Sequence, residues 1–171
     1  MRYLATTFLF FGLSTVATAS PLVGMKEYPE RPPLHPTEII DQSGAPFSLN
    51  RLAGRTALIN LWATWCGPCV KELPALNRLA ALLPRDRFEI VALSQDKGGI
   101  AVARPFLEKH NIRNLNLYAD PSGRLYRNIG AKGLPTTLVV SPDGRLIGRI
   151  EGAIDWDAPE VTNYLNALHP R

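Results

Sequence analysis

Residues 57–69 read ALINLWATWCGPC, and this stretch decides the fold that we predict for the chain. Its first six residues form a short, nearly continuous apolar run, which is typical of a central strand covered on both faces. From Cys66 the chain takes up helical periodicity, which continues to about residue 83. The pair Cys66 and Cys69 is therefore predicted at the junction between a buried strand and a helix.

Cys66 is predicted at the N-terminus of that helix. Free backbone N–H groups and the positive end of the helix dipole favour an anion there, so we expect the Cys66 thiolate to form near neutral pH. Residues three apart are neighbours on a helix, which places Cys69 to close a disulfide with Cys66 across the first turn. Pro68 suits a first helical turn, and Gly67 leaves the approach to Cys66 open.

This arrangement predicts a dithiol that exchanges disulfides. Cys66 would attack a disulfide and form a mixed disulfide, which Cys69 would resolve. Two other interpretations stay open, an inert structural disulfide and half of a metal site, although a tetrahedral site needs four ligands. The three histidines, His35, His110 and His169, show no ligand spacing. We therefore predict surface histidines and no metal site.

The rest of the chain alternates strands and helices. Apolar runs predict further strands at 88–93, 137–140 and 146–151. Helical patterns lie at about 66–83, 99–110, 122–129 and 157–168. Such alternation implies an α/β sandwich, a mixed sheet flanked by helices. Ahead of it, residues 38–49 hold two extended pieces around a Ser-Gly turn, which predicts an N-terminal β-hairpin.

The N-terminus has the pattern of an export signal. Arg2 is followed by an apolar stretch at 4–16 and small residues at 17–19, which predicts a signal peptide over 1–19. The uncharged run 3–25 is also nearly long enough to span a bilayer, so a retained membrane anchor is the alternative. Both interpretations place the domain outside the cytoplasm.

The next segment, 20–36, is predicted to be a proline-rich linker ahead of one compact domain at 37–171. It contains Pro21, Pro29, Pro32, Pro33 and Pro36. The formal net charge is +4 with scattered positive residues, which gives no support to nucleic-acid binding. Two cysteines are too few for a small fold stapled by disulfides.

The chain resembles the thioredoxin superfamily and, within it, the exported TlpA-like and ResA-like thiol-disulfide oxidoreductases. The likeness is carried by LWATWCGPC at 61–69, KELP at 71–74, ALSQD at 92–96, GLPTT at 133–137 and GAIDW at 152–156. It covers about residues 37–168 and implies a thioredoxin-like three-layer sandwich.

In that family the proline matching Pro135 is cis, packs beside the active-site sulfurs and follows backbone that pairs with an extended substrate. The resemblance therefore implies that Leu134 and Pro135 contact the substrate, together with Gly67 and Pro68. An ordinary trans proline starting a strand is the alternative. Trp65 is expected to cover one side of the reactive sulfur, or else to be a structural core tryptophan.

Glu72 is an anomalous carboxylate on an apolar helix face. It follows the spacing of Leu76, Leu79 and Leu83 and shares that face with Cys69. Burial would raise its pKa, and the resemblance implies a proton-handling role; an edge carboxylate reaching solvent is the alternative. Asn60 stands where cytoplasmic thioredoxins carry a buried acid, and we expect a neutral amide bonded within the core.

The resemblance implies a reductase of protein disulfide clients, without a cofactor, in the periplasm or another extracytoplasmic space. Expected clients are apocytochrome c or copper-oxidase assembly proteins, and the electron donor is a membrane thiol carrier of the CcdA/DsbD type. The alternatives are a disulfide-forming oxidase and a non-enzymatic module that binds Cu(I) through its two thiols. We expect a monomer, anchored to the inner membrane if the N-terminal segment is retained.

Overall fold

The structure is a computed structural model that describes residues 22–168. Its strands form one sheet of eight, in the order β1-β8-β7-β4-β5-β6-β2-β3. The strands are β1 (Met25–Glu27), β2 (Glu38–Ile40), β3 (Pro46–Ser48), β4 (Thr56–Trp62), β5 (Phe88–Ser94), β6 (Asn116–Ala119), β7 (Thr136–Val140) and β8 (Leu146–Glu151). The helices are η1 (Leu49–Leu52), α1 (Gly67–Leu82), α2 (Ile100–Lys109), α3 (Arg124–Asn128) and α4 (Pro159–Ala167).

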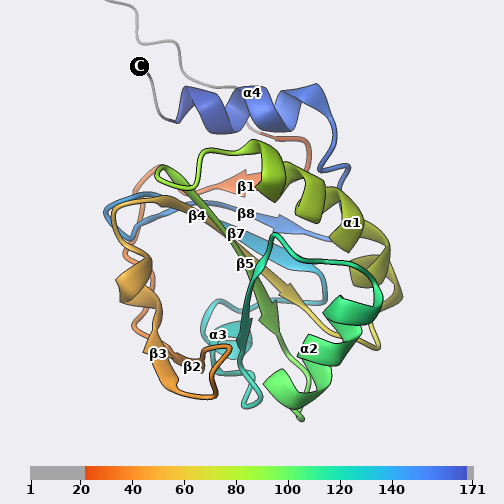
Figure 1. The fold of residues 1–171 in the computed structure, drawn as a ribbon. Coiled ribbons are helices and arrows are strands. Elements are labelled where there is room, and N and C mark those ends of the chain that lie inside the picture. The colour runs from red at the N-terminus through yellow and green to blue at the C-terminus, as the bar shows by residue number, and fades with distance from the viewer. Residues whose placement is uncertain (1–21, 169–171) are drawn as a thin grey trace, which may run out of the picture.

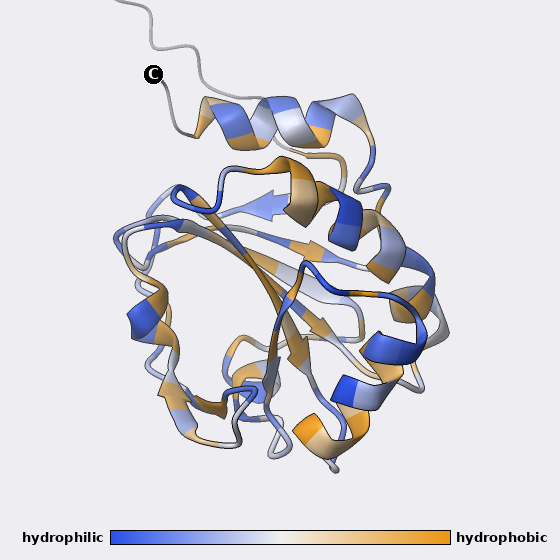
Figure 2. Ribbon diagram, viewed as in Figure 1, coloured by the Kyte–Doolittle hydropathy of each residue, from blue (hydrophilic) through white to orange (hydrophobic). Residues whose placement is uncertain are grey.

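The centre of the sheet is β4, which pairs in parallel with β5 and antiparallel with β7. All seven of its residues are buried, as the apolar run predicts. Figure 2 shows the central strands in the hydrophobic colour, whereas the helices carry hydrophilic residues on their outer faces. The predicted α/β fold with a mixed sheet is confirmed.

Alternate residues of β4 serve opposite faces of the sheet. Leu58 belongs to a buried cluster with residues of α1 and α4, and Trp62 to one with residues of α1 and α2. Ile59, between them, packs with η1 and α3. Helices α1, α2 and α4 therefore cover one face and the shorter helices the other, which gives three layers (Figure 1).

The N-terminal hairpin also forms as predicted. Strands β2 and β3 pair antiparallel, with Ile39 opposite Phe47. The side chain of Asp41 accepts hydrogen bonds from the backbone of Ser43 and Ala45 inside the turn. Strand β2 then joins the main sheet through one pairing with β6, so the hairpin extends that edge.

The linker prediction for residues 20–36 is wrong within the described part of the chain. Met25–Glu27 forms β1, which pairs antiparallel with β8 at one edge of the sheet. Leu22 and Leu34 are both buried, and Pro33 bridges to Arg145. Prolines are tolerated at the edge of a sheet because no neighbouring strand needs the backbone N–H that proline lacks.

Strand β6 was not predicted, since its four residues begin with a polar asparagine and alternate in burial. The predicted signal peptide or anchor at 1–19 lies outside the described residues, as does His169. Among the helices of residues 22–168, none is both long and apolar enough to cross a membrane.

Candidate active site

The two cysteines form a disulfide at the start of α1. Strand β4 ends at Trp62, and Cys66 is the N-cap residue of the helix, with Pro68 in its first turn. The Cys66–Cys69 bond measures 2.06 Å between sulfurs and 5.3 Å between Cα atoms. The backbone N–H of Cys69 donates to Cys66 Sγ at 3.3 Å, so a free helical N–H already faces this sulfur.

The two sulfurs have different surroundings. Cys69 is fully buried, whereas Cys66 keeps 6% of its surface and lines a cavity. Beside it, Trp65 is 71% exposed, which excludes the alternative of a structural core tryptophan. The exposed indole therefore stands next to the sulfur that a partner can reach.

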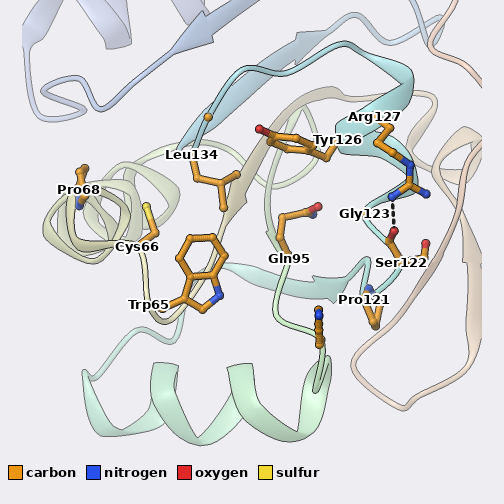
Figure 3. A pocket seen from close by; sticks show the side chains of 12 residues that line it. Trp65, Cys66, Pro68, Gln95, Pro121, Ser122, Gly123, Tyr126, Arg127 and Leu134 are labelled. Atoms are coloured by element: carbon orange, nitrogen blue, oxygen red, sulfur yellow. Dashed lines mark hydrogen bonds between the residues drawn. The ribbon is translucent and has the colours of Figure 1, made fainter.

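The loop before β7 also lines this site, with Leu134 beside Cys66 (Figure 3). The Leu134-Pro135 peptide bond is cis, as the resemblance implies, so the trans alternative is wrong. Leu134 lines the cavity together with Cys66. The Thr136 hydroxyl donates to the Gly133 carbonyl at 2.8 Å, which fixes the loop.

The loop after β5 holds the residues just before the Cys66–Cys69 motif. The carboxylate of Asp96, just after β5, accepts the Thr64 backbone N–H at 3.0 Å and the Thr64 hydroxyl at 2.7 Å. The Ser94 hydroxyl donates to the same carboxylate at 2.9 Å. These bonds hold the turn that leads into Trp65, a contact that the sequence did not reveal.

Glu72 lies one turn after Cys69 on α1 and is 5% exposed, which excludes the alternative of an edge carboxylate reaching solvent. Asn60 Nδ2 donates to its Oε1 at 2.8 Å, and Trp156 Nε1 donates to its Oε2 at 2.9 Å. The Ile154 backbone N–H also donates to Oε2, at 3.3 Å. The carboxyl group is thus held by three segments far apart in the sequence.

Burial raises the pKa of the Glu72 carboxyl, because desolvation penalises its charged form. The donors Trp156, Asn60 and Ile154 act against that rise, since they stabilise the carboxylate. Asn60 also donates to the Thr137 hydroxyl at 2.9 Å, and so it is bonded within the core as expected. Sequence reasoning quoted residues 152–156 only as part of the resemblance and missed that Trp156 contacts Glu72.

The cavity beside Cys66 has a volume of about 620 Å³. Figure 3 shows Gln95 between Trp65 and Tyr126, with Arg127 on the side away from Cys66. Lys97 also lines it. Within residues 22–168, no group of three or more His, Cys, Asp or Glu side chains is placed to hold a metal ion.

Known proteins share this fold and motif. The Redoxin family model matches residues 29–168. The thiol-disulfide oxidoreductase ResA of Bacillus thuringiensis subsp. konkukian is 30% identical over 132 residues, which are 77% of this chain and 74% of that protein. ResA of Oceanobacillus iheyensis is 32% identical over 135 residues, covering 79% and 67%.

A solved structure from Chlorobium tepidum, assigned as the thiol:disulfide interchange protein DsbE, superposes with a TM-score of 0.70. It is 25% identical and covers 80% of this chain and 96% of its own. The sequence likeness and the structural likeness thus extend over the same domain.

Proposed function

The chain belongs to the Redoxin family as a ResA-like thiol-disulfide oxidoreductase of the thioredoxin superfamily, and from this we propose that it reduces cysteine pairs in other exported proteins. The observation that carries the proposal is the Cys66–Cys69 bond at a helix tip, with Cys66 alone of the two cysteines opening into a cavity. A sulfur in that position is both reachable and stabilised as an anion.

The exchange proceeds in two displacements. The Cys66 thiolate attacks one sulfur of a client disulfide, forming a mixed disulfide and releasing one client thiolate. Cys69, as its thiolate, then attacks Cys66 Sγ, which forms the Cys66–Cys69 bond and releases the second client thiolate. Two electrons pass to the client, and its two thiolates take up protons.

Glu72 is the group that we assign to the proton of Cys69. Cys69 is buried, so its thiol has no direct exchange with bulk water. Glu72 is buried on the same helix, and its raised pKa lets it accept and return a proton closer to neutral pH than an ordinary carboxyl does. Leu134 and Pro68 line the cavity with Cys66, and we assign client contact to these two residues together with Pro135 and Gly67.

The direction of transfer is the finer part of the proposal. Thioredoxin, a reductant, has a potential of about −270 mV, whereas the strong periplasmic oxidant DsbA lies at about −120 mV. Equilibrating the Cys66–Cys69 pair with glutathione buffers measures this potential directly. We expect a value near that of thioredoxin, and a value near that of the oxidant would replace the reductase by a disulfide-forming oxidase.

The setting of the reaction is proposed from the same family membership. Export would be directed by residues 1–19, as a cleaved signal peptide or a retained anchor, and mass spectrometry of the mature N-terminus distinguishes the two. A membrane thiol carrier of the CcdA/DsbD type would return electrons. Trapping with Cys69→Ser, followed by mass spectrometry, tests for apocytochrome c or copper-oxidase assembly clients.

A further inference from the structure

We propose that the cavity beside Cys66 recognises an acidic side chain next to the reactive cysteine of a client polypeptide. Disulfides flanked by Asp or Glu are then exchanged faster than those flanked by Lys or Arg. This inference rests on the proposed function and narrows its substrate class.

The cavity begins at the reacting sulfur. Cys66, Trp65 and Leu134 lie close together at one end of it, and Arg127 lies at the far end (Figure 3). A polypeptide joined to Cys66 Sγ therefore lies across the opening, and its neighbouring side chains are the groups that can enter. A volume of about 620 Å³ lies within the range of ordinary ligand sites, so it accepts a side chain with part of its backbone.

Two cations line the cavity from separate segments, Lys97 in the loop after β5 and Arg127 in α3. The lining includes no Asp or Glu among the described residues, and neither cation forms an ion pair within residues 22–168. Arg127 Nη1 donates to the Ser122 carbonyl at 2.6 Å, which orients the guanidinium (Figure 3). In the part of the chain that the structure describes, its other N–H groups have no partner and can donate to an anion.

The carboxylates of Asp96 and Asp120, each next in sequence to a lining residue, are engaged with other protein groups. Asp120 accepts hydrogen bonds from the Ser122 hydroxyl and from the backbone N–H groups of Arg124 and Leu125 at the start of α3. Asp96 is buried and holds Thr64. Both face protein donors, so an incoming carboxylate is the complementary partner for the two cations.

The remaining wall favours a polypeptide over a small anion. Trp65, Tyr126 and Leu134 offer apolar surface to the body of a side chain. Gln95 also lines the cavity, and it lies between Trp65 and Tyr126 (Figure 3). The cavity thus combines an apolar wall and two cations.

The test uses three disulfide-bonded peptides that differ only in the residue beside one cysteine: Glu, Gln or Lys. Stopped-flow fluorescence gives the rate constants for their reduction by the reduced full chain, and for the oxidation of their dithiol forms by the disulfide form. We expect the Glu peptide to react about tenfold faster than the Lys peptide at low ionic strength, with the ratio shrinking in 0.5 M salt.

Two double variants, one inside the cavity and one outside it, each remove two positive charges. Lys97→Gln with Arg127→Gln should bring the Glu-to-Lys ratio close to one, and Lys97→Gln alone should lower it while keeping the Arg127–Ser122 bond. Lys109→Gln with Lys132→Gln, exposed cations outside the cavity, should preserve it.

Equal rates for the three peptides would overturn the inference. So would a preference for the Glu peptide that stays unchanged in the Lys97→Gln, Arg127→Gln double variant. Failure of the proposed function has a different signature, since an oxidising potential leaves the peptide preference measurable in the oxidation direction.

Discussion

The two ends of one disulfide lie in unlike surroundings. Cys66 faces a cavity lined by an exposed indole, loop backbone and two cations that form no ion pair within residues 22–168. Cys69 is fully buried and lies one helical turn before a buried carboxyl group. A single turn of α1 therefore separates the side that we assign to clients from the side that we assign to proton transfer. One sulfur lies at the surface and its partner in the core, so we expect the two cysteines to have different roles.

The two sides are also built differently. The proposed client side is formed by loops at the ends of strands, the start of α1 and the short helix α3, where side chains can vary without disturbing the sheet. The buried side joins Asn60 of β4, Glu72 of α1 and Trp156 after β8 through hydrogen bonds. Changes on the first side should alter partners, and changes on the second should alter pH dependence and stability.

The largest effect on exchange activity is expected from replacing either cysteine, one at a time, with serine. Cys66→Ser removes the nucleophile, so both insulin reduction and mixed-disulfide formation should vanish. Cys69→Ser should abolish turnover yet accumulate mixed disulfides, visible on non-reducing gels. If Cys66→Ser trapped partners as well as Cys69→Ser does, the assignment of the two sulfurs would be reversed.

Glu72→Gln should come next, with about a 100-fold slower exchange at the pH optimum and loss of the corresponding step in the pH–rate profile. Glutamine keeps the shape of the side chain but cannot take up the proton, and its amide nitrogen replaces one of the two oxygens that accept hydrogen bonds. Glu108→Gln, an exposed change on α2, is the matched control. A profile that Glu72→Gln leaves unchanged would assign the proton to another group.

The same substitution should change stability in a defined pH window. Because the pKa of Glu72 is raised above 4.5, the folded chain holds a proton that the unfolded chain releases. The free energy of unfolding should therefore fall as pH rises from about 4.5 through the folded pKa, by up to about 1.4 kcal/mol per pH unit. Urea unfolding of the oxidised protein measures this slope, which Glu72→Gln should remove.

Trp156→Phe tests one contact on the buried side. The indole N–H opposes the rise in the Glu72 pKa, so its loss should raise that pKa further and move the step in the pH–rate profile to higher pH. Leaving a buried acceptor short of a donor should also cost about 1–3 kcal/mol of stability. A step at the wild-type pH would show that the contact is only structural.

The smallest effect is expected from Arg78→Ala, which lies outside both regions. Arg78 pairs with Asp157 between α1 and the start of α4, and both side chains are exposed. Solvent screens such pairs, so the Tm should fall by about 2 °C or less and exchange kinetics should stay unchanged. A larger loss of activity would mean that the two sides of the disulfide respond to the packing of α4.

Local pattern was enough to predict the central fold. The apolar run of β4, the helical spacing after Cys66 and the hairpin turn near Ser43 each depend on neighbouring residues, and each is confirmed. The short β6 and the proline-flanked β1 were missed because their stability comes from pairing with β5 and β8. Their own residues have little strand character.

The residues of the site also divide into those that local spacing predicts and those that depend on contacts between distant segments. The burial of Glu72 was predictable, since its spacing places it on an apolar helix face. Its partner Trp156 was not, because a contact across 84 residues depends on how distant segments meet. The cations Lys97 and Arg127 were missed for the same reason, since nothing in the sequence between them indicates that they line one cavity.

The two edges of the sheet bear on whether other polypeptides can add strands to it. The outermost strands, β1 and β3, have three residues each, and β3 begins with a proline. Unfolded chains add readily to long, regular sheet edges, and that is how aggregates start. We therefore expect the short edges of this sheet to be poor templates for the addition of further strands.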